Sequence, residues 1–412
     1  MSLTNKRFLI ISHGHPDLNK GGAEIAAYSL YEEMRSRDLD AYFLARTDMT
    51  PHGGAAFSSR NNEREILFHT TMDDGFTFSN IQTRHIWQEF RDLLLLLKPD
   101  VVHLHHFFLL GIEILEEIRR SLPESKIVLT LHEYLAICNN RGLMVKTNGK
   151  LCYKSSSRDC HNCFPEKQPG DFFLREQYIK RMFAQVDVFI SPSEFLKERY
   201  LDWGIPKKPF YVIENGQSEQ ININLEEVSN ESQKVTFAFF GQINPYKGID
   251  VLIEAIMLLP KKVRNMLVVD IHGANLEHQS DKYQMDVARL LNKASKWVNF
   301  YGSYESKELP SLLDRVDWVI VPSIWWENSP MVIQEALASK VPLIVSDIGG
   351  MSEKVTNNVN GLHFRAGKPL ALAEKMSQVV MDRDIKIKMQ KNINPVVSVN
   401  HCLDRFLNEC YL

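Results

Sequence analysis

The sequence predicts an α/β fold built from two doubly wound domains, and three observations support this prediction. The chain has 412 residues, which is more than a single hydrophobic core usually supports. Short apolar runs rich in Val and Ile alternate with helix-length amphipathic segments, a pattern typical of parallel sheets covered on both faces. This alternation occurs twice, and a polar stretch separates the two rounds.

The first round predicts an N-terminal domain at residues 1–215. Its first strand, at 7–12, ends in small polar residues, and a helix from about 22 to 37 follows it. Further strands are expected at 41–45, 101–105, 127–131, 186–191 and 210–213. A cysteine-rich segment at 138–165 has too few apolar residues to form a core, so we interpret it as an insert in this domain.

The polar stretch at 216–233 predicts an interdomain linker. A second domain then covers 234–395, with strands at 235–240, 267–271, 298–301, 318–321 and 343–345. Its helices are expected near 250–259, 330–339 and 369–381. The end of the chain, 396–412, is expected to form a helix that packs back on the first domain.

The composition is that of an ordinary soluble enzyme, with 44% apolar and 24% charged residues. The net charge of −3 argues against nucleic acid as a partner, because phosphate binding needs a basic face. The sequence shows neither an apolar run long enough to span a bilayer nor a secretion signal. We therefore expect a cytoplasmic protein, and a local basic patch could still dock it on the inner face of the cytoplasmic membrane.

The strongest functional signal is the segment 325–336. Ser329 is a good N-cap and Pro330 suits a first helical position, so a helix is predicted to begin here with an anion site at its N-terminus. Glu327 precedes this helix and Glu335 lies on its second turn, so the two carboxylates are suited to gripping vicinal hydroxyls of one ligand. The alternative is a capped surface helix with two solvated acids.

Other loops after strands carry phosphate-binding features, as expected for open α/β sheets, which bind ligands at the carboxyl ends of their strands. Lys247 follows the first strand of the second domain, where it could neutralise a diphosphate; a turn with a solvated lysine is the alternative. Gly349 and Gly350 form a second glycine-rich loop that could face phosphates. In the first domain Gly21 and Gly22 open a helix as a phosphate loop would, or form a simple strand-to-helix turn.

Two groups of residues raise the question of metal binding. His103 and His105 share a strand face, but we interpret them as cleft or packing residues. Four cysteines, Cys138, Cys152, Cys160 and Cys163, lie in the polar insert, and their clustering favours a structural zinc site. Loosely packed reduced cysteines are the alternative.

Several of these motifs occur together in one known family. The sequence resembles glycosyltransferase family 4, retaining enzymes of the GT-B fold, in which two Rossmann-like domains face each other across a cleft. The resemblance rests on residues 21–24 (GGAE), 130–134 (TLHEY), the Lys247-Gly248 loop, Glu327 with seven residues before Glu335, and residues 360–362 (NGL). It covers nearly the whole chain in the expected order, and the Glu-x7-Glu segment is its most specific part.

The resemblance implies a donor site in the second domain and an acceptor site in the first. Glu335 would bind the donor ribose, Glu327 would contact the transferred sugar or lie near the reaction centre, and Lys247 would bind the diphosphate. Asn328, Ser329, Pro330 and Met331 would hold phosphate and sugar, Gly21 and Gly22 would let the first domain approach the diphosphate, and His132 would line the reaction centre. The sequence departs from the family at Gln242, where an arginine usually assists the lysine; Arg46 and Arg141 are candidate substitutes.

The function expected from this resemblance is transfer of a hexose-type sugar, with retention, from a nucleoside-diphosphate sugar to a hydroxyl of a glycan or lipid-linked saccharide in cell-surface polysaccharide biosynthesis. No cofactor is expected for catalysis, and the insert is expected to shape acceptor choice. Attack on the face from which the phosphate departs is favoured over double displacement through Glu327. The alternatives are a nucleotide-sugar epimerase or a phosphorylase of the same fold, and a catalytically silent sugar-binding or assembly protein.

Overall fold

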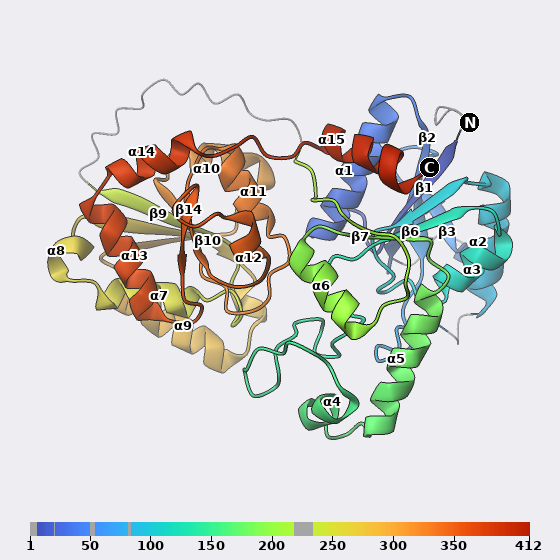
Figure 1. Cartoon of the computed structure of the whole chain (residues 1–412), viewed down its shortest axis with the longest axis horizontal. Helices are drawn as coiled ribbons and strands as arrows, with labels where there is room; N and C mark the ends of the chain where they lie inside the picture. The colour runs from blue at the N-terminus through green and yellow to red at the C-terminus, as the bar shows by residue number, and fades with distance from the viewer. Residues whose placement is uncertain (1–5, 20, 50–53, 81–83, 218–233) are drawn as a thin grey trace. The chain divides into compact units, whose positions relative to one another are not determined.

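The computed structural model describes residues 6–19, 21–49, 54–80, 84–217 and 234–412. The chain forms two compact units (Figure 1), the first made of Met1–Ser218 and Val397–Leu412 and the second of Glu219–Val396. Of the predicted linker at 216–233, only residues 216 and 217 lie within the described part.

The first unit is built on an eight-stranded sheet of order β3-β4-β2-β1-β5-β6-β7-β8. Every neighbouring pair is parallel except β3 with β4, which is antiparallel. The strands are β1 (Arg7–Ser12), β2 (Asp40–Thr47), β3 (Phe57–Ser59), β4 (Glu65–His69), β5 (Val101–Leu104), β6 (Lys126–Thr130), β7 (Val188–Ser191) and β8 (Phe210–Val212).

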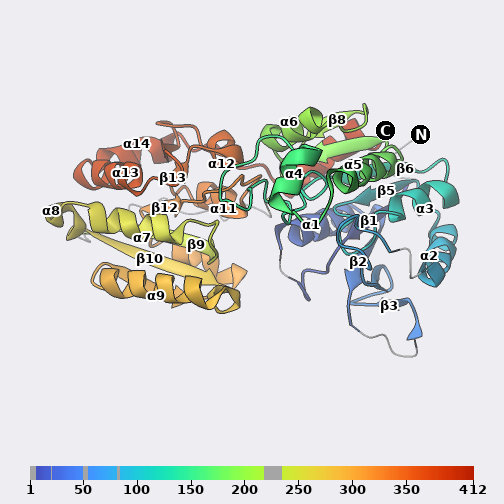
Figure 2. The same cartoon turned by 90° about the horizontal axis from the view of Figure 1, so that it is seen from below.

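Helices cover this sheet, and one core forms where α1 and α15 pack on it. That core joins Ala27 and Met34 of α1, Leu403 of α15 and strand residues such as Phe8 and Phe43. Elsewhere in this unit, helices α2 and α3 lie side by side (Figure 2). The helices of the unit are α1 (Gly22–Ser36), α2 (Arg84–Leu97), α3 (Ile114–Ser121), α4 (Ser157–Cys163), α5 (Pro169–Phe183), α6 (Glu194–Trp203) and α15 (Val399–Arg405), the last continued by a π-helical turn at Phe406–Cys410.

The end of the chain belongs to the first unit because it is bonded there at its entry. Gln217 N–H donates to the Val397 carbonyl at 2.9 Å, and Val399 N–H donates to the Gln217 carbonyl at 3.0 Å. A Cβ on Gly216 would lie 2.5 Å from the Cα of Val399, so only glycine allows this approach. From this point α15 runs beside α1 (Figure 1).

The second unit has a six-stranded parallel sheet of order β11-β10-β9-β12-β13-β14. Its strands are β9 (Val235–Gln242), β10 (Leu267–Ala274), β11 (Val298–Gly302), β12 (Trp318–Val321), β13 (Leu343–Ser346) and β14 (Gly361–Phe364). Its helices are α7 (Ile249–Leu258), α8 (Lys261–Arg264), α9 (Asp281–Ala294), α10 (Leu309–Leu313), α11 (Met331–Ala338), α12 (Gly349–Lys354), α13 (Pro369–Met381) and α14 (Asp384–Lys391), with short 3₁₀ turns at Leu276–His278 and Ser306–Glu308.

The sheet of the second unit is buried on both faces. One core packs α7, α9 and α13 against it, with Leu252, Val287 and Met376 as members. The other packs α10, α11 and α12, with Leu313 and Ile333 as members. Two cores on opposite faces of one parallel sheet are what the continuous apolar strands predict. The α/β class with two doubly wound sheets is confirmed.

Each sheet has one switch point, the place from which the strand order continues in opposite directions. In the first it lies between β1 and β5, and in the second between β9 and β12. Loops that follow these strands diverge there and leave room for a ligand at the carboxyl ends of the strands. Gly21 follows β1, Lys247 follows β9 and Glu327 follows β12, so these candidate residues lie in such loops, whereas His132 follows β6.

Candidate active site

The loop after β9 lies against the end of β12 in the second unit. Ile324 N–H donates to the Tyr246 carbonyl at 2.9 Å. Gly248, the N-cap of α7, has φ 71°, and a Cβ there would lie 2.0 Å from the Pro322 carbonyl oxygen. Glycine therefore brings the two loops together and delivers Lys247 to the residues after β12.

Lys247 and Glu327 form an ion pair within this unit. Lys247 Nζ donates to Glu327 Oε1 at 2.6 Å, and the same oxygen accepts hydrogen bonds from Ser323 Oγ at 2.7 Å and Trp325 Nε1 at 2.9 Å. Glu327 is only 6% exposed, so its charge is stabilised by these three donors and not by water. Lys247 and Glu327, which the sequence predicts as separate contacts of the nucleotide-sugar donor, thus lie side by side.

The glycine-rich loop at α12 supports the backbone of Glu327. Gly350 N–H donates to the Glu327 carbonyl at 2.7 Å, and a Cβ on Gly350 would lie 1.6 Å from the Asn328 carbonyl oxygen. Gly349 has φ 59°, and its Cβ would lie 2.8 Å from the Glu327 carbonyl oxygen. These glycines allow close backbone packing, which explains them without a phosphate.

The predicted start of the next helix is wrong by one residue. α11 begins at Met331, Pro330 is its N-cap with φ −65° and ψ 121°, and no side chain caps it. Ser329 therefore precedes the cap and does not form it. Its Oγ is buried and finds no hydrogen-bond partner among the described residues, so this hydroxyl is available to a ligand. Asn328 and Met331 lie next to it in the chain, at the half-buried start of the helix.

Glu335 lies on the second turn of α11, as predicted, and is partly buried. Burial raises the pKa of this carboxyl from 4.5 to about 7. Tyr304 lies near enough for the charge of Glu335 to act on it: burial first, and then Glu335, raises the pKa of the Tyr304 hydroxyl to about 12. A partly buried carboxyl with a raised pKa is typical of a binding site.

An aromatic group that the sequence analysis missed surrounds Tyr304. The His272 ring stacks on Phe240 (centroids 5.0 Å apart, planes at 11°) and on Tyr301 (4.7 Å, 8°), and Tyr304 packs edge-on against Phe240 at 5.6 Å. These residues come from the ends of β9, β10 and β11. Aromatic residues after consecutive strands were the signal that could have located them.

The structure places Gln242, which stands where the family usually has an arginine, and the two candidate substitutes, Arg46 and Arg141. Gln242 is the last residue of β9 and is exposed. Arg46 belongs to the first unit, where it is buried, donates from Nε to the Thr70 carbonyl at 2.8 Å and lies 3.7 Å from Asp48. Arg141 lies in the insert with φ 50°.

The first unit gathers four histidines after β1, β5 and β6. His13 Nε2 lies 3.2 Å from Glu24 Oε1, and the His13 ring packs on His106 at 4.5 Å. His106 Nε2 lies 2.5 Å from Glu133 Oε1. The other two are His105 and His132, the latter predicted from the sequence at the reaction centre, and His132 Nε2 lies 3.1 Å from His105 Nδ1. His13 Nδ1 and His105 Nε2 are buried without a hydrogen-bond partner among the described residues.

The imidazoles of His13, His105 and His132 have lowered pKa values, so these three rings are neutral. Burial, and then the charges of neighbouring histidines, lowers the pKa of His13 to about 2 and that of His132 to about 3, and it lowers the pKa of His105 well below its ordinary value. One ring nitrogen of each neutral pair must donate and the other accept. These three rings therefore offer polar contacts without a positive charge.

The first unit also places the glycines of the predicted phosphate loop. Gly21 caps α1 and Gly22 begins it. A Cβ on Gly21 would lie 2.3 Å from Glu24 Oε2, because the Glu24 side chain folds back over the loop towards His13. Gly21 thus gives room to Glu24.

His103 is a packing residue, as expected. It is fully buried, its Nδ1 lies 2.7 Å from Tyr411 Oη and its Nε2 lies 2.7 Å from Thr130 Oγ1. Both ring nitrogens are occupied by hydroxyls, so His103 is not placed to bind a metal.

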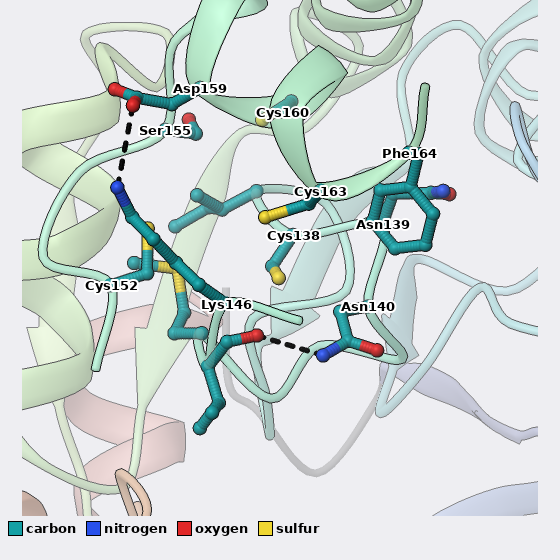
Figure 3. A pocket seen from close by; sticks show the side chains of 13 residues that line it. Cys138, Asn139, Asn140, Lys146, Cys152, Ser155, Asp159, Cys160, Cys163 and Phe164 are labelled. Atoms are coloured by element: carbon teal, nitrogen blue, oxygen red, sulfur yellow. Dashed lines mark hydrogen bonds and ion pairs between the residues drawn. The ribbon is translucent and has the colours of Figure 1, made fainter. Parts of the chain in front are cut away.

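The four cysteines of the insert line one pocket, together with Lys146 and Asp159 (Figure 3). All four are free thiols, and each is partly buried. Burial, then the charge of Cys138, raises the pKa of the Cys160 thiol to about 11. Within the described ranges, no three His, Cys, Asp or Glu residues are gathered closely enough to hold a metal ion. The zinc site stays a prediction.

Comparisons with known proteins agree with this geometry. A family model described as Glycosyltransferase Family 4 matches residues 20–218, and one described as Glycosyl transferases group 1 matches residues 221–395. The chain is 28% identical over 280 residues to the lipopolysaccharide 1,2-N-acetylglucosaminetransferase of Salmonella typhimurium, covering 64% of this chain and 68% of that protein. It is 26% identical over 385 residues to the putative glycosyltransferase YtcC of Bacillus subtilis, covering 92% and 86%.

Other relatives match over a shorter region. An uncharacterised glycosyltransferase of Methanocaldococcus jannaschii, MJ1607, is 26% identical over 232 residues, which is 53% of this chain and 57% of the relative. The chain spans about half the length of this and of other curated relatives that it matches.

Solved structures match over almost the whole chain. Sucrose-phosphate synthase of Thermosynechococcus elongatus superposes with a TM-score of 0.68 at 15% identity, covering 98% of this chain and 95% of that one. Anabaena HepE in complex with UDP-glucose superposes with a TM-score of 0.65 at 16% identity, covering 98% and 99%. The matching structures show the GT-B fold, and the two family models, which together match residues 20–218 and 221–395, show that the chain belongs to glycosyltransferase family 4.

Proposed function

We propose that this protein is a retaining glycosyltransferase that moves a hexose-type sugar from a nucleoside-diphosphate sugar to a hydroxyl of a glycan or lipid-linked saccharide. The observation that carries the proposal is the Lys247–Glu327 ion pair at the switch point of the second sheet, with Glu335 on the helix that follows Glu327. The relative from Salmonella acts on lipopolysaccharide, and HepE binds UDP-glucose, which supports a role in cell-surface polysaccharide synthesis.

In the proposed donor site, the nucleoside lies along α11 and the diphosphate near Lys247. Glu335 accepts hydrogen bonds from the ribose hydroxyls, and the aromatic group with His272 and Tyr304 lies beside it for the base. The unpartnered Ser329 hydroxyl and the start of α11 face the phosphates and sugar. As the sugar–phosphate bond breaks, negative charge grows on the diphosphate, and Lys247 stabilises it.

The contacts of Glu327 support same-face attack over double displacement. Its Oε1 accepts three hydrogen bonds, one of them from a cation, so the charge of the carboxylate is stabilised and its nucleophilicity reduced. We propose that Glu327 instead holds Lys247 and contacts the transferred sugar. The acceptor hydroxyl then attacks on the face from which the phosphate leaves, and a phosphate oxygen takes its proton.

Because Gln242 stands where the family usually has an arginine, Lys247 supplies a larger share of the leaving-group stabilisation. An amide donates hydrogen bonds but carries no charge, so the diphosphate meets one cation at this strand end where the family resemblance implies two. We propose that turnover is slower for this reason, and that Gln242→Arg raises it.

We propose that the first unit binds the acceptor, with His132 at the reaction centre, and that it contacts the inner face of the cytoplasmic membrane. In the described part of the chain no helix is long and apolar enough to cross a bilayer. α5 exposes Phe173 (54%) and Leu174 (65%), and Arg181 two turns further along is also exposed. Apolar and basic side chains on one helix suit contact with anionic lipid.

We also propose that the four cysteines of the insert bind structural zinc. They surround one pocket, and the segment between Cys138 and Cys163 has little core of its own. Zinc sites form together with the fold around them, so their ligands need not be gathered before the metal binds.

One experiment tests the main proposal most directly. The protein is incubated with UDP-, GDP- and ADP-hexoses, and thermal stabilisation and release of nucleoside diphosphate are measured. Stabilisation by one nucleotide, with sugar transfer to an added glycan acceptor, is the expected result. An epimerised donor would identify an epimerase instead, and binding with neither hydrolysis nor transfer would identify a silent sugar-binding protein.

A further inference from the structure

The end of the chain reaches the interior of the first unit beneath the histidine group. Tyr411 is fully buried and packs on Phe8 (ring centroids 5.5 Å apart) and Phe406 (5.9 Å). Its backbone carbonyl accepts a hydrogen bond from Lys6 Nζ at 2.9 Å. The ring and the backbone of Tyr411 are thus both held in place.

The hydroxyl of Tyr411 begins a hydrogen-bonded chain that leads to the strand carrying His132. Tyr411 Oη lies 2.7 Å from His103 Nδ1, and His103 Nε2 lies 2.7 Å from Thr130 Oγ1. Thr130 ends β6, and His132 is two residues further on. A ring held at both nitrogens by hydroxyls cannot rotate without breaking a buried hydrogen bond.

A second path leads through ring packing. The His103 ring packs against the His105 ring, with centroids 4.4 Å apart, and His105 Nδ1 lies 3.1 Å from His132 Nε2. The rings of His105 and His132 stack at 5.3 Å with planes at 24°. His103 is therefore connected to His132 in two ways, through Thr130, two residues before it in the chain, and through the packed ring of His105.

We propose that Tyr411 is a positioning residue for His132, acting through His103 to hold the orientation of the His105–His132 pair. This inference rests on the proposed function in one respect only, namely that His132 lies at the reaction centre. Tyr411 touches no substrate in this scheme. Its hydroxyl lies 2.7 Å from Nδ1 of His103 and is the polar contact of that nitrogen among the described residues.

The test is Tyr411→Phe, which keeps the ring packing and removes the hydroxyl. We expect kcat to fall about tenfold, while the donor KM and the thermal shift produced by the nucleoside diphosphate stay within about twofold, since the proposed donor contacts lie in the second unit. Tyr178→Phe is the matched control: Tyr178 Oη lies 2.7 Å from Glu113 Oε1 in the same unit, outside the histidine group. It should lower thermal stability to a similar extent and leave kcat unchanged.

A spectroscopic measurement separates this inference from the proposed function. In protein labelled with ¹⁵N-histidine, the ring nitrogen resonances of His105 and His132 should shift in Tyr411→Phe and stay in place in Tyr178→Phe. If no donor is used even by the unaltered protein, the proposed function fails, and these resonances still decide the positioning role. Unchanged resonances in Tyr411→Phe would overturn it.

The path through His103 is tested by a double-mutant cycle. If Tyr411 acts through His103, then Tyr411→Phe combined with His103→Gln should reduce kcat no further than His103→Gln alone. Additive losses would contradict the proposed path. Because His103→Gln alters a fully buried residue, His103→Asn serves as a second variant, and its amide can still meet the Tyr411 hydroxyl.

Discussion

Lys247 and Glu327, 80 residues apart in the sequence, share a hydrogen bond of 2.6 Å at the switch point of the second sheet. The pair explains why each residue needs the other before any ligand arrives. Glu327 is almost fully buried, and an unpaired carboxylate there would carry a large desolvation cost.

Removing the cation alone should therefore be worse for folding than removing both charges. We expect Lys247→Ala to destabilise the protein by about 2 kcal/mol or more, because it leaves a buried carboxylate with two neutral donors. Lys247→Ala combined with Glu327→Gln should regain most of this loss, as measured by thermal unfolding. Both variants should lose at least about a hundredfold in kcat/KM, because removing a group that stabilises transition-state charge typically costs this much. Equal stability of the single and double variants would contradict the ion-pair account.

Gly248 should tolerate no side chain, although it touches no ligand in the proposed mechanism. Alanine there must adopt φ near 71° and place Cβ 2.0 Å from the Pro322 carbonyl oxygen. We expect Gly248→Ala to cost about 3 kcal/mol, the sum of strain and displaced backbone, and to abolish activity because Lys247 moves. Gly367→Ala is the control: its φ is 66°, but its Cβ would meet only Ile324 at 3.7 Å, so about 1 kcal/mol is expected there. Thermal unfolding of the two variants gives the comparison.

Binding of the donor should depend on pH through Glu335. Its pKa is raised to about 7 by burial, and in the proposed donor site the ionised form accepts hydrogen bonds from the ribose hydroxyls. Affinity for the nucleoside diphosphate, measured by calorimetry, should therefore rise as the pH increases through 7. Glu335→Gln should bind more weakly at pH 8 and show a flat profile. A profile that keeps its midpoint near 7 in this variant would assign the titration to another group.

The same carboxyl predicts a stability effect of known sign in the free protein. Its folded pKa of about 7 lies above the ordinary value of 4.5, so the stability that its neutral form contributes is present below pH 4.5 and is lost as the pH rises through 7. We expect Glu335→Gln to unfold at a higher temperature than the parent at pH 8 and at nearly the same temperature at pH 4.5. Thermal scans without ligand at the two pH values measure this difference.

The cysteine insert gives a prediction that does not depend on activity. Protein purified without added metal should contain close to one equivalent of zinc by elemental analysis, and its four thiols should resist alkylation until a chelator is added. Cys402 and Cys410, which are buried in the first unit away from the insert, serve as the matched cysteine pair for Ser substitution. Less than about half an equivalent of zinc, with unprotected thiols, would contradict the zinc site and identify loosely packed reduced cysteines instead.

Most of the architecture could be predicted from the sequence because buried parallel strands are written as continuous apolar runs. β1 and β12 are clear examples, since all or nearly all of their residues are buried. β4 escaped prediction because its first residue is Glu65, whose buried carboxylate accepts hydrogen bonds from Asn61 and Asn62. A charge satisfied by neighbours in the same loop interrupts an apolar pattern without interrupting the strand.

The candidate site could be predicted only in part. The Glu327 and Glu335 spacing and the Lys247 loop are local patterns, so they were visible. The Lys247–Glu327 bond, the stacking of His272 on Tyr301 and the reach of Tyr411 to His103 join residues far apart in the sequence. Such contacts are set by sheet order, which no local pattern records. The start of α11 was misplaced by one residue. The sequence favours Ser329 as the N-cap and Pro330 as the first helical residue, but in the structure Pro330 is the N-cap and Met331 is the first helical residue.

The glycines around Glu327 have a consequence for any survey of variants. Gly350 cannot accept even a methyl group without displacing the Asn328 carbonyl, and a Cβ on Gly349 would lie 2.8 Å from the Glu327 carbonyl oxygen. In a saturation screen for activity, both positions should be as intolerant as Lys247, although neither meets the donor in the proposed mechanism. Mutational intolerance in this loop therefore reports the spacing of two backbones, and a map of ligand contacts drawn from intolerance alone would be too large.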